Sequence, residues 1–171
     1  MQPTYGSNII LIGMPGSGKS TLGHRLAKLW GMPFVDTDDL IEQHRGVNIQ
    51  QLLDQNSLQQ FRNTEEQVLC SMDLSNHVIA TGGSAVYSAA GMEHLRKLGR
   101  VIYLSISPST LLQRVKNSAA RGLVRQPGQS LESLHDERRP LYERWSDLNL
   151  LNDRPLSTLQ LDSLAKQILG K

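Results

Sequence analysis

A glycine-rich segment near the N-terminus carries the most specific chemical signal in the chain. It fits the pattern G-x-x-x-x-G-K-[ST] and consists of Gly13, Met14, Pro15, Gly16, Ser17, Gly18, Lys19, Ser20 and Thr21. Glycines let such a loop wrap around a phosphate with its N–H groups pointing inward, and a following helix adds its positive dipole end. Lys19 can reach the β- and γ-phosphates, and the Ser20 hydroxyl can bind Mg²⁺. This phosphate loop (residues 13–21) therefore predicts nucleoside triphosphate binding.

Two aspartates, Asp36 and Asp38, stand at the end of a short apolar segment at residues 33–36. If this segment is a strand that ends beside the phosphate loop, one carboxylate lies near Mg²⁺ and the other near the accepting hydroxyl. Phosphoryl transfer needs a metal that neutralises charge and a group that orients or deprotonates the nucleophile. The alternative is that Asp38 or Asp39 merely caps the next helix, a role that is compatible with catalysis.

Three further features indicate where an anionic substrate would bind. Arg62 and Glu65 lie three positions apart on a predicted helix, so the carboxylate can hold the guanidinium ready to grip an anion. The alternative for this pair is a solvated surface salt bridge. Gly82 and Gly83 directly follow the third apolar segment, where they allow close approach of a ligand or form a plain turn. Arg138 adds positive charge to a late helix, for which the alternative is a solvated face.

Short apolar runs alternate with helical patterns along the chain. Candidate strands span residues 8–12, 33–36, 77–81, 100–105 and 148–151. Helical patterns lie near residues 19–30, 38–45, 48–54, 58–73, 89–97, 108–117, 130–145 and 158–169. This alternation predicts a three-layer α/β domain, in which helices flank a five-stranded parallel sheet and ligands bind at the carboxyl ends of the strands. We expect one domain over residues 1–171.

One segment, at residues 117–130, lacks periodicity. A loop of this length in a small domain is usually functional or disordered, and we interpret it as a lid over the nucleotide. The alternative is a plain surface connection. We expect residues 118–129 to be the most mobile internal segment without ligand and to become ordered when both substrates are bound.

Composition argues against several classes of partner. The 18 basic and 16 acidic residues nearly balance, and no basic run is interleaved with aromatic residues, so we expect no nucleic-acid partner. No apolar stretch approaches the roughly 18 residues of a membrane span, so we expect no membrane partner. The single cysteine, Cys70, cannot form an internal disulfide and is expected to be a core residue on a helix. We expect a cytoplasmic monomer.

Taken together, these segments resemble the shikimate kinase family from Ile9 to Leu169. Because many unrelated enzymes share the phosphate loop, the specificity comes from the ordered set that includes Asp36-x-Asp38, Phe61-Arg62-x-x-Glu65, Gly82-Gly83 and Arg138-x-Pro140-Leu141-Tyr142. The resemblance implies a P-loop kinase fold with a lid, with ATP as co-substrate and Mg²⁺ as cofactor. It also implies transfer of the γ-phosphate to a shikimate hydroxyl, giving shikimate 3-phosphate and ADP in aromatic amino-acid biosynthesis.

The resemblance further implies roles at the nucleotide end. Lys19 contacts the transferring phosphate, Ser20 binds Mg²⁺, and Asp36 lies in the outer shell of the metal. Arg121 matches the lid arginine that closes on the phosphates. The family's adenine-binding elements correspond to Arg114 and to a loop made of Asp153, Arg154 and Pro155.

At the acceptor end, the resemblance makes Asp38 the partner of the ring hydroxyls and the candidate base. Arg62 and Arg138 hold the substrate carboxylate, and Glu65 orients Arg62. The glycine pair completes the set, with the backbone N–H of Gly83 directed to the substrate. The substrate-binding candidates are therefore Asp38, Arg62, Glu65, Gly82, Gly83 and Arg138.

The chain departs from the family pattern in two places. Ser84 replaces the third glycine of the glycine run, and the lid motif arginine-proline-leucine-leucine is replaced by Arg121-Gly122-Leu123-Val124. Arg125 is therefore a rival to Arg121 as the lid arginine. Two other functions remain open, namely a kinase for another hydroxylated acid such as gluconate and a nucleotide-binding regulator that has lost turnover. Retention of Asp38 and of the Arg62–Glu65 pair favours an enzyme.

Overall fold

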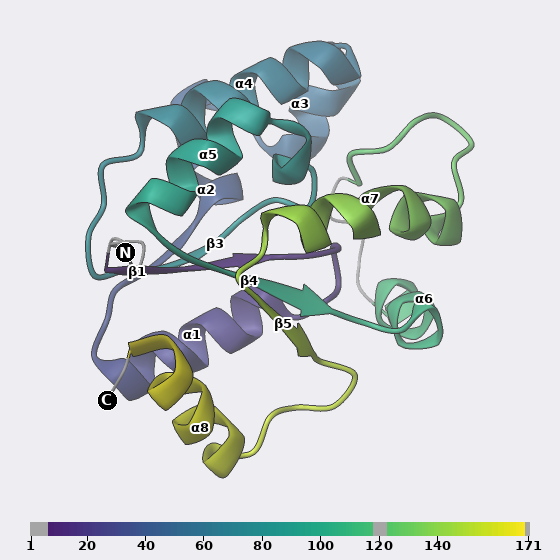
Figure 1. Ribbon diagram of the computed structural model, residues 1–171. Helices are drawn as coiled ribbons and strands as arrows, with labels where there is room; N and C mark the ends of the chain where they lie inside the picture. The colour runs from purple at the N-terminus through teal and green to yellow at the C-terminus, as the bar shows by residue number, and fades with distance from the viewer. Residues whose placement is uncertain (1–6, 118–122, 170–171) are drawn as a thin grey trace.

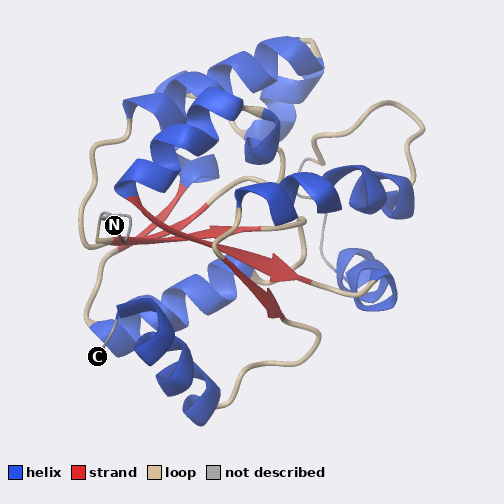
Figure 2. Ribbon diagram, viewed as in Figure 1, coloured by secondary structure: helices blue, strands red, loops and turns tan. Residues whose placement is uncertain are grey.

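The computed structural model describes residues 7–117 and 123–169, and a parallel sheet forms the middle of its three layers (Figures 1 and 2). The strands are β1 (Asn8–Ile12), β2 (Phe34–Asp36), β3 (Val78–Ala80), β4 (Gly99–Ser105) and β5 (Leu148–Leu151). They lie in the order β2-β3-β1-β4-β5, and all neighbours are parallel. The predicted α/β fold is therefore confirmed, and each strand ends within one residue of its predicted bounds.

The two central strands are apolar because helices cover both faces of the sheet. Every residue of β1 is buried, and in β4 only Arg100 and Ser105 are partly exposed. Ile10 of β1 pairs with Ile79 of β3 on one side and with Val101 of β4 on the other. Since all strands point the same way, the segments that follow β1, β2 and β3 meet at one edge of the sheet.

Most of the helices cover the two faces of the sheet (Figure 1). One face carries α1 (Lys19–Trp30) and α8 (Thr158–Leu169), and the opposite face carries α4 (Leu58–Ser71), α5 (Ala89–Leu98) and α7 (Leu131–Trp145). The remaining helices are α2 (Thr37–Arg45), α3 (Ile49–Gln55), the short 3₁₀ helix η1 (Ala85–Tyr87) and α6 (Pro108–Asn117). Among these, η1 is the element that the sequence pattern missed. No helix of the described ranges is long and apolar enough to span a membrane.

One alternative and one expectation from the sequence are wrong. The N-cap of α2 is Asp36, whose Oδ1 accepts a hydrogen bond of 3.1 Å from the backbone N–H of Asp38, so neither Asp38 nor Asp39 caps this helix. Cys70 lies on α4 as expected but is exposed. The buried stripe of α4 consists of Phe61, Thr64, Glu65, Val68 and Leu69, and Cys70 follows it on the solvent side.

The described part of the predicted lid, residues 123–130, contains no helix or strand. Val124 is buried there and packs with the apolar residues of α2, α3 and α4. Residues 118–122 of the segment, Gly122 among them, lie outside the described residues, so the expected mobility of residues 118–129 stays a prediction. Val124 thus anchors the described part of the segment against α2, α3 and α4.

Candidate active site

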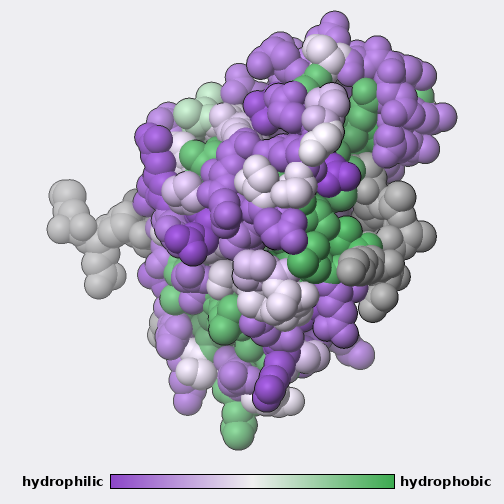
Figure 3. All heavy atoms as spheres, turned by 90° about the vertical axis from the view of Figure 1, so that its right-hand side faces the viewer, coloured by the Kyte–Doolittle hydropathy of each residue, from purple (hydrophilic) through white to green (hydrophobic). Residues whose placement is uncertain are grey.

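A cavity of about 920 Å³ lies at the carboxyl ends of the strands. Figure 3 views this end of the molecule, where hydrophobic surface lies next to strongly hydrophilic surface. The predicted site residues among its lining are Pro15, Gly16, Gly18, Lys19, Ser20, Thr21, Asp36, Asp38, Gly82, Gly83, Arg114, Arg138 and Pro155. The phosphate loop and the candidate acid-binding residues therefore share one cavity.

The phosphate loop has the backbone geometry that its glycines allow. Gly13 has a φ of 149° and Gly18 a φ of 93°, both in the region that favours glycine. A side chain at Gly13 would also place its Cβ 2.6 Å from the carbonyl oxygen of Leu104. Lys19 begins α1, and its Nζ donates hydrogen bonds of 2.8 and 2.9 Å to the carbonyls of Gly13 and Met14. The lysine thus folds back over the loop whose amides would face a phosphate.

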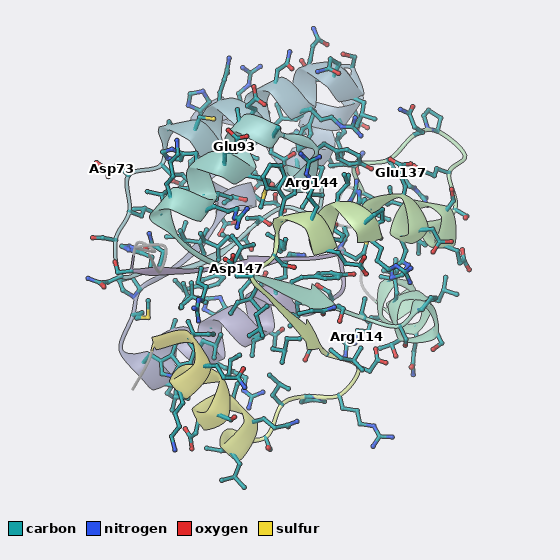
Figure 4. All side chains as sticks on the ribbon, viewed as in Figure 1. Asp73, Glu93, Arg114, Glu137, Arg144 and Asp147 are labelled. Carbon is teal, nitrogen blue, oxygen red and sulfur yellow. The ribbon has the colours of Figure 1, made fainter. Side chains whose placement is uncertain are left out.

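Arg114 joins the phosphate loop to the segment after β5. Figure 4 shows Arg114 beside that segment. Its Nη1 donates to the carbonyls of Gly16 and Ser17, and its Nη2 donates to those of Asn152 and Asp153, at 2.7 and 3.2 Å. Asn152 reinforces the link, because its Nδ2 donates to the Ser17 carbonyl at 2.7 Å. Sequence reasoning missed Asn152, since nothing local ties it to a loop 135 residues earlier.

Ser20 and Asp36 form a pair of oxygen groups between α1 and the end of β2. The Ser20 hydroxyl donates to Asp36 Oδ2 at 2.9 Å, while the other oxygen of Asp36 caps α2. Within the described ranges, no group of three or more His, Cys, Asp or Glu residues could hold a metal alone. A hydroxyl and one carboxylate suit Mg²⁺, which keeps several waters and binds substrate phosphates rather than an all-protein cage.

Two carboxylates, that of half-buried Asp38 and that of buried Glu65, flank the turn at Gly82 and Gly83, here called the glycine turn. A Cβ at Gly82 would lie 2.6 Å from Asp38 Oδ1 and 2.8 Å from Glu65 Oε1. Burial raises the pKa of Asp38 to about 6, with a further upward contribution from Asp36 and an opposing one from Lys19. The pKa of Asp38 therefore lies close to the value that suits a general base working near neutral pH.

Glu65 is held by the residue that departs from the family pattern. The buried Ser84 hydroxyl donates to Glu65 Oε2 at 2.5 Å, and Ser84 takes an ordinary φ of −91° and ψ of −7°, so serine fits here without backbone strain. Burial raises the pKa of Glu65 to about 7 against the opposing effect of this hydrogen bond. Glu65 Oε1 is buried and has no hydrogen-bond partner among the described residues.

The expected arrangement of Arg62 and Glu65 differs from the observed one. Glu65 is paired with Ser84, and the Arg62 guanidinium carbon instead lies 3.8 Å from the ring centroid of Tyr87. Neither Arg62 nor Glu65 lines the cavity. The Ser84 hydroxyl, which a glycine at this position would lack, is the donor that pairs with the Glu65 carboxylate.

Arg138 lines the cavity although it is completely buried. Its Nη2 donates to the Val124 carbonyl, its Nε donates to the Tyr87 hydroxyl at 3.4 Å, and its Nη1 has no partner among the described residues. That unpartnered nitrogen would lie 2.9 Å from a Cβ at Gly83, which is close to the cavity wall. A buried cation with a spare donor is the group that an anionic ligand satisfies.

Some of the predicted nucleotide-binding residues do not line the cavity. Gly13, Met14 and Ser17 are buried in the phosphate loop without lining the cavity, and Arg154 is exposed outside it. Arg125 lines the cavity with an exposed side chain that donates to the Gln129 carbonyl at 2.8 Å.

The proposed lid arginine, Arg121, lies outside the described residues. The choice between Arg121 and Arg125 therefore stays a prediction.

Comparison with known proteins gives consistent matches. The family model described as shikimate kinase matches residues 15–169. A shikimate kinase from Thiobacillus denitrificans is 40% identical over 146 residues, which cover 84% of this chain and 80% of that protein. One from Histophilus somni is 36% identical over 161 residues, 92% of each chain. A solved shikimate kinase from Acinetobacter baumannii in complex with shikimate has a TM-score of 0.80 and 33% identity, covering 98% of this chain and 94% of that one.

The raised pKa of Glu65 predicts a pH-dependent stability difference. Because its folded pKa of about 7 exceeds the ordinary 4.5, deprotonation of Glu65 destabilises the folded state progressively as pH rises through this window. Glu65→Gln can still accept the Ser84 hydrogen bond but cannot ionise. We expect the unfolding free energy of Glu65→Gln relative to wild type to increase between pH 5 and pH 8, on the order of 2 kcal/mol. Urea unfolding at both pH values measures it, and equal pH dependence of the two proteins would contradict the assignment.

Proposed function

The chain belongs to the shikimate kinase family, and from this membership we propose that it transfers the γ-phosphate of ATP to a ring hydroxyl of shikimate. The products are shikimate 3-phosphate and ADP. The observation that carries the proposal is the single cavity that joins the phosphate loop to Asp38 and Arg138. Such a cavity suits an acceptor that has both a hydroxyl to phosphorylate and a carboxylate to anchor.

At the nucleotide end, the amides of the phosphate loop and the N-terminus of α1 hold the β- and γ-phosphates. Lys19, which now donates to loop carbonyls, turns its ammonium toward the transferring phosphate. Arg114 and Pro155 flank the adenine side. Since Arg114 also braces the loop carbonyls, nucleotide affinity and loop geometry depend on the same guanidinium.

Ser20 and Asp36 are the residues that would hold Mg²⁺. Their oxygens are 2.9 Å apart, and the Ser20 hydroxyl is free to rotate its proton away so that its lone pairs face a cation. When bound, Mg²⁺ neutralises charge on the phosphates as the transferring group loosens from ADP. Asp36 would contribute with Oδ2 alone, because Oδ1 already accepts the hydrogen bond that caps α2.

At the acceptor end, ionised Asp38 accepts the proton of the attacking hydroxyl. The hydroxyl oxygen forms a new bond to the γ-phosphorus, the bond from the γ-phosphorus to the bridging oxygen breaks, and ADP leaves with that electron pair. The proton is left on the Asp38 carboxyl, whose pKa of about 6 lets it pass to water before the next turnover. This role needs Asp38 to face the phosphate loop, and both line the same cavity.

The substrate carboxylate binds to Arg138 Nη1 beside the Gly83 amide. Arg62, which lies at the Tyr87 ring and outside the cavity lining, supplies the second guanidinium when the acid is bound. Arg138 is held by Val124, Tyr87 and the packing around Gly83, so its spare nitrogen is already oriented. A fork of two guanidinium groups distinguishes a carboxylate from a neutral group by both charge and geometry.

We also propose that the enzyme acts as a cytoplasmic monomer. The proposal is supported by the residues assigned to the chemistry, from Lys19 to Arg138, which come from one chain and line one cavity, and the cytoplasm supplies ATP. Sedimentation of the active enzyme tests the monomer.

A coupled ADP-release assay across a panel of hydroxy acids tests the function. We expect shikimate to be phosphorylated with a higher kcat/KM than gluconate or other hydroxylated acids. Lys19→Ala should lower kcat by ~10³ or more, because phosphoryl transfer relies on electrostatic stabilisation. A preference for gluconate would support the related kinase, and no ADP release with any acid would support the regulator. A turnover number of Lys19→Ala within tenfold of wild type would contradict the assignment of residues 13–21 as the catalytic phosphate loop.

The pKa of Asp38 predicts the acid limb of the pH profile. Below about pH 6 the carboxyl is protonated and cannot accept the hydroxyl proton, so kcat/KM for shikimate should fall about tenfold per pH unit. Asp38→Asn should lower kcat by about 10²–10⁴ and abolish this limb. Glu65→Gln is the control, since it removes the neighbouring titration and should keep the limb. An unchanged limb in Asp38→Asn would exclude Asp38 as the base.

The lid assignment is tested by two alanine substitutions. We propose that Arg121 contacts the phosphates, because it directly precedes the segment that resembles the family's lid motif. Arg121→Ala should therefore lower kcat more than Arg125→Ala, whose side chain already donates to the Gln129 carbonyl. Turnover numbers at saturating ATP and shikimate measure the difference, and the opposite order would reverse the assignment.

A further inference from the structure

Tyr87 contacts both arginines of the acceptor end, although it belongs to none of the motifs that carry the family resemblance. It is the last residue of η1, directly after the glycine turn, and is half-buried. The guanidinium carbons of Arg62 and Arg138 lie 3.8 and 5.3 Å from its ring centroid. Both distances are within the range of cation–π attraction, which is strongest where the cation is partly desolvated.

The Tyr87 hydroxyl makes a second set of contacts. It accepts a hydrogen bond of 3.4 Å from Arg138 Nε and donates to Glu137 Oε1 on the exposed side of α7, which Figure 4 labels. Gln129 Nε2 donates to the other oxygen of Glu137 at 2.7 Å. Burial raises the pKa of Tyr87 and the hydrogen bond from Tyr87 lowers that of Glu137, so the phenol stays a donor and Glu137 an anion.

Arg62 needs such a partner because no carboxylate of the described residues forms an ion pair with its guanidinium. Glu65, the expected partner, is bonded to Ser84. Arg62 Nε is buried without a hydrogen-bond partner among the residues that the structure describes, and Arg138 Nη1 is in the same condition. Two like charges near one ring repel each other, so each must be fixed by other contacts until an anion binds between them.

We propose that Tyr87 is a positioning residue that holds Arg62 beside Arg138 for the substrate carboxylate, an inference that rests on the proposed function. Its ring face fixes Arg62, and this contact carries the positioning role. The hydrogen bond of its hydroxyl from Arg138 Nε is long, at 3.4 Å, and Arg138 is also held by the Val124 carbonyl, so the hydroxyl contributes little. The ring therefore takes the part that the family resemblance gives to Glu65. Tyr87 acts on acid binding and not on the nucleotide, because its contacts are to α4, α7 and residues near the acceptor end.

Ring-free and ring-keeping substitutions separate these contacts. Tyr87→Leu removes the ring, and we expect it to raise KM for shikimate about tenfold while kcat stays within about threefold and KM for ATP is unchanged. Tyr87→Phe keeps the ring and should stay within about threefold of wild type in all three constants. Tyr87→Met is a second ring-free variant in case the leucine variant does not fold, and thermal unfolding checks each protein.

A double-mutant cycle with Arg62→Met tests whether Tyr87 acts through Arg62. If it does, Tyr87→Leu should raise KM for shikimate much less in the Arg62→Met background than in wild type. Additive losses, an equal loss in Tyr87→Phe, or an unchanged KM in both ring-free variants would overturn the assignment. A wild-type protein that phosphorylates no shikimate would instead contradict the proposed function.

Discussion

The glycine turn after β3 must pass between charged side chains with no room for a side chain of its own. Asp38 and Glu65 crowd Gly82, while Pro15 and Arg138 crowd Gly83. The sheet order β2-β3-β1 makes this possible, because it places the ends of β2 and β3 beside the phosphate loop that follows β1. The three charged side chains of the acceptor end, Asp38, Glu65 and Arg138, therefore pack directly against the glycine turn.

Burying these charges leaves the site incomplete in a way that a substrate can correct. Among the residues that the structure describes, one nitrogen of fully buried Arg138 and one oxygen of buried Glu65 have no hydrogen-bond partner. Unpaired polar groups of this kind are costly in a folded protein unless a ligand or water satisfies them. The same desolvation raises the pKa of Asp38 and of Glu65. A hydroxylated acid would supply an anion to the arginines and a hydroxyl to Asp38 in one step.

Much of the fold could be predicted because its signals are local. The apolar runs predicted each strand to within one residue, and the glycine pattern of the phosphate loop predicted its class of ligand. The misses came from contacts between residues far apart in the chain. Asn152 reaches Ser17, Ser84 takes Glu65 away from Arg62, and Tyr87 stands in its place. No periodicity encodes which of two neighbouring donors a buried carboxylate will choose.

The structure indicates that one cavity brings the γ-phosphate to a hydroxyl of an acid held by its carboxylate. Phosphorus NMR of a reaction with ATP and shikimate tests this, because it identifies the atom that receives the phosphate. We expect a phosphate monoester, coupled to the ring proton at C3 of shikimate, that appears at the same rate as ADP. Formation of inorganic phosphate at the rate of ADP, with no ester on shikimate, would contradict it.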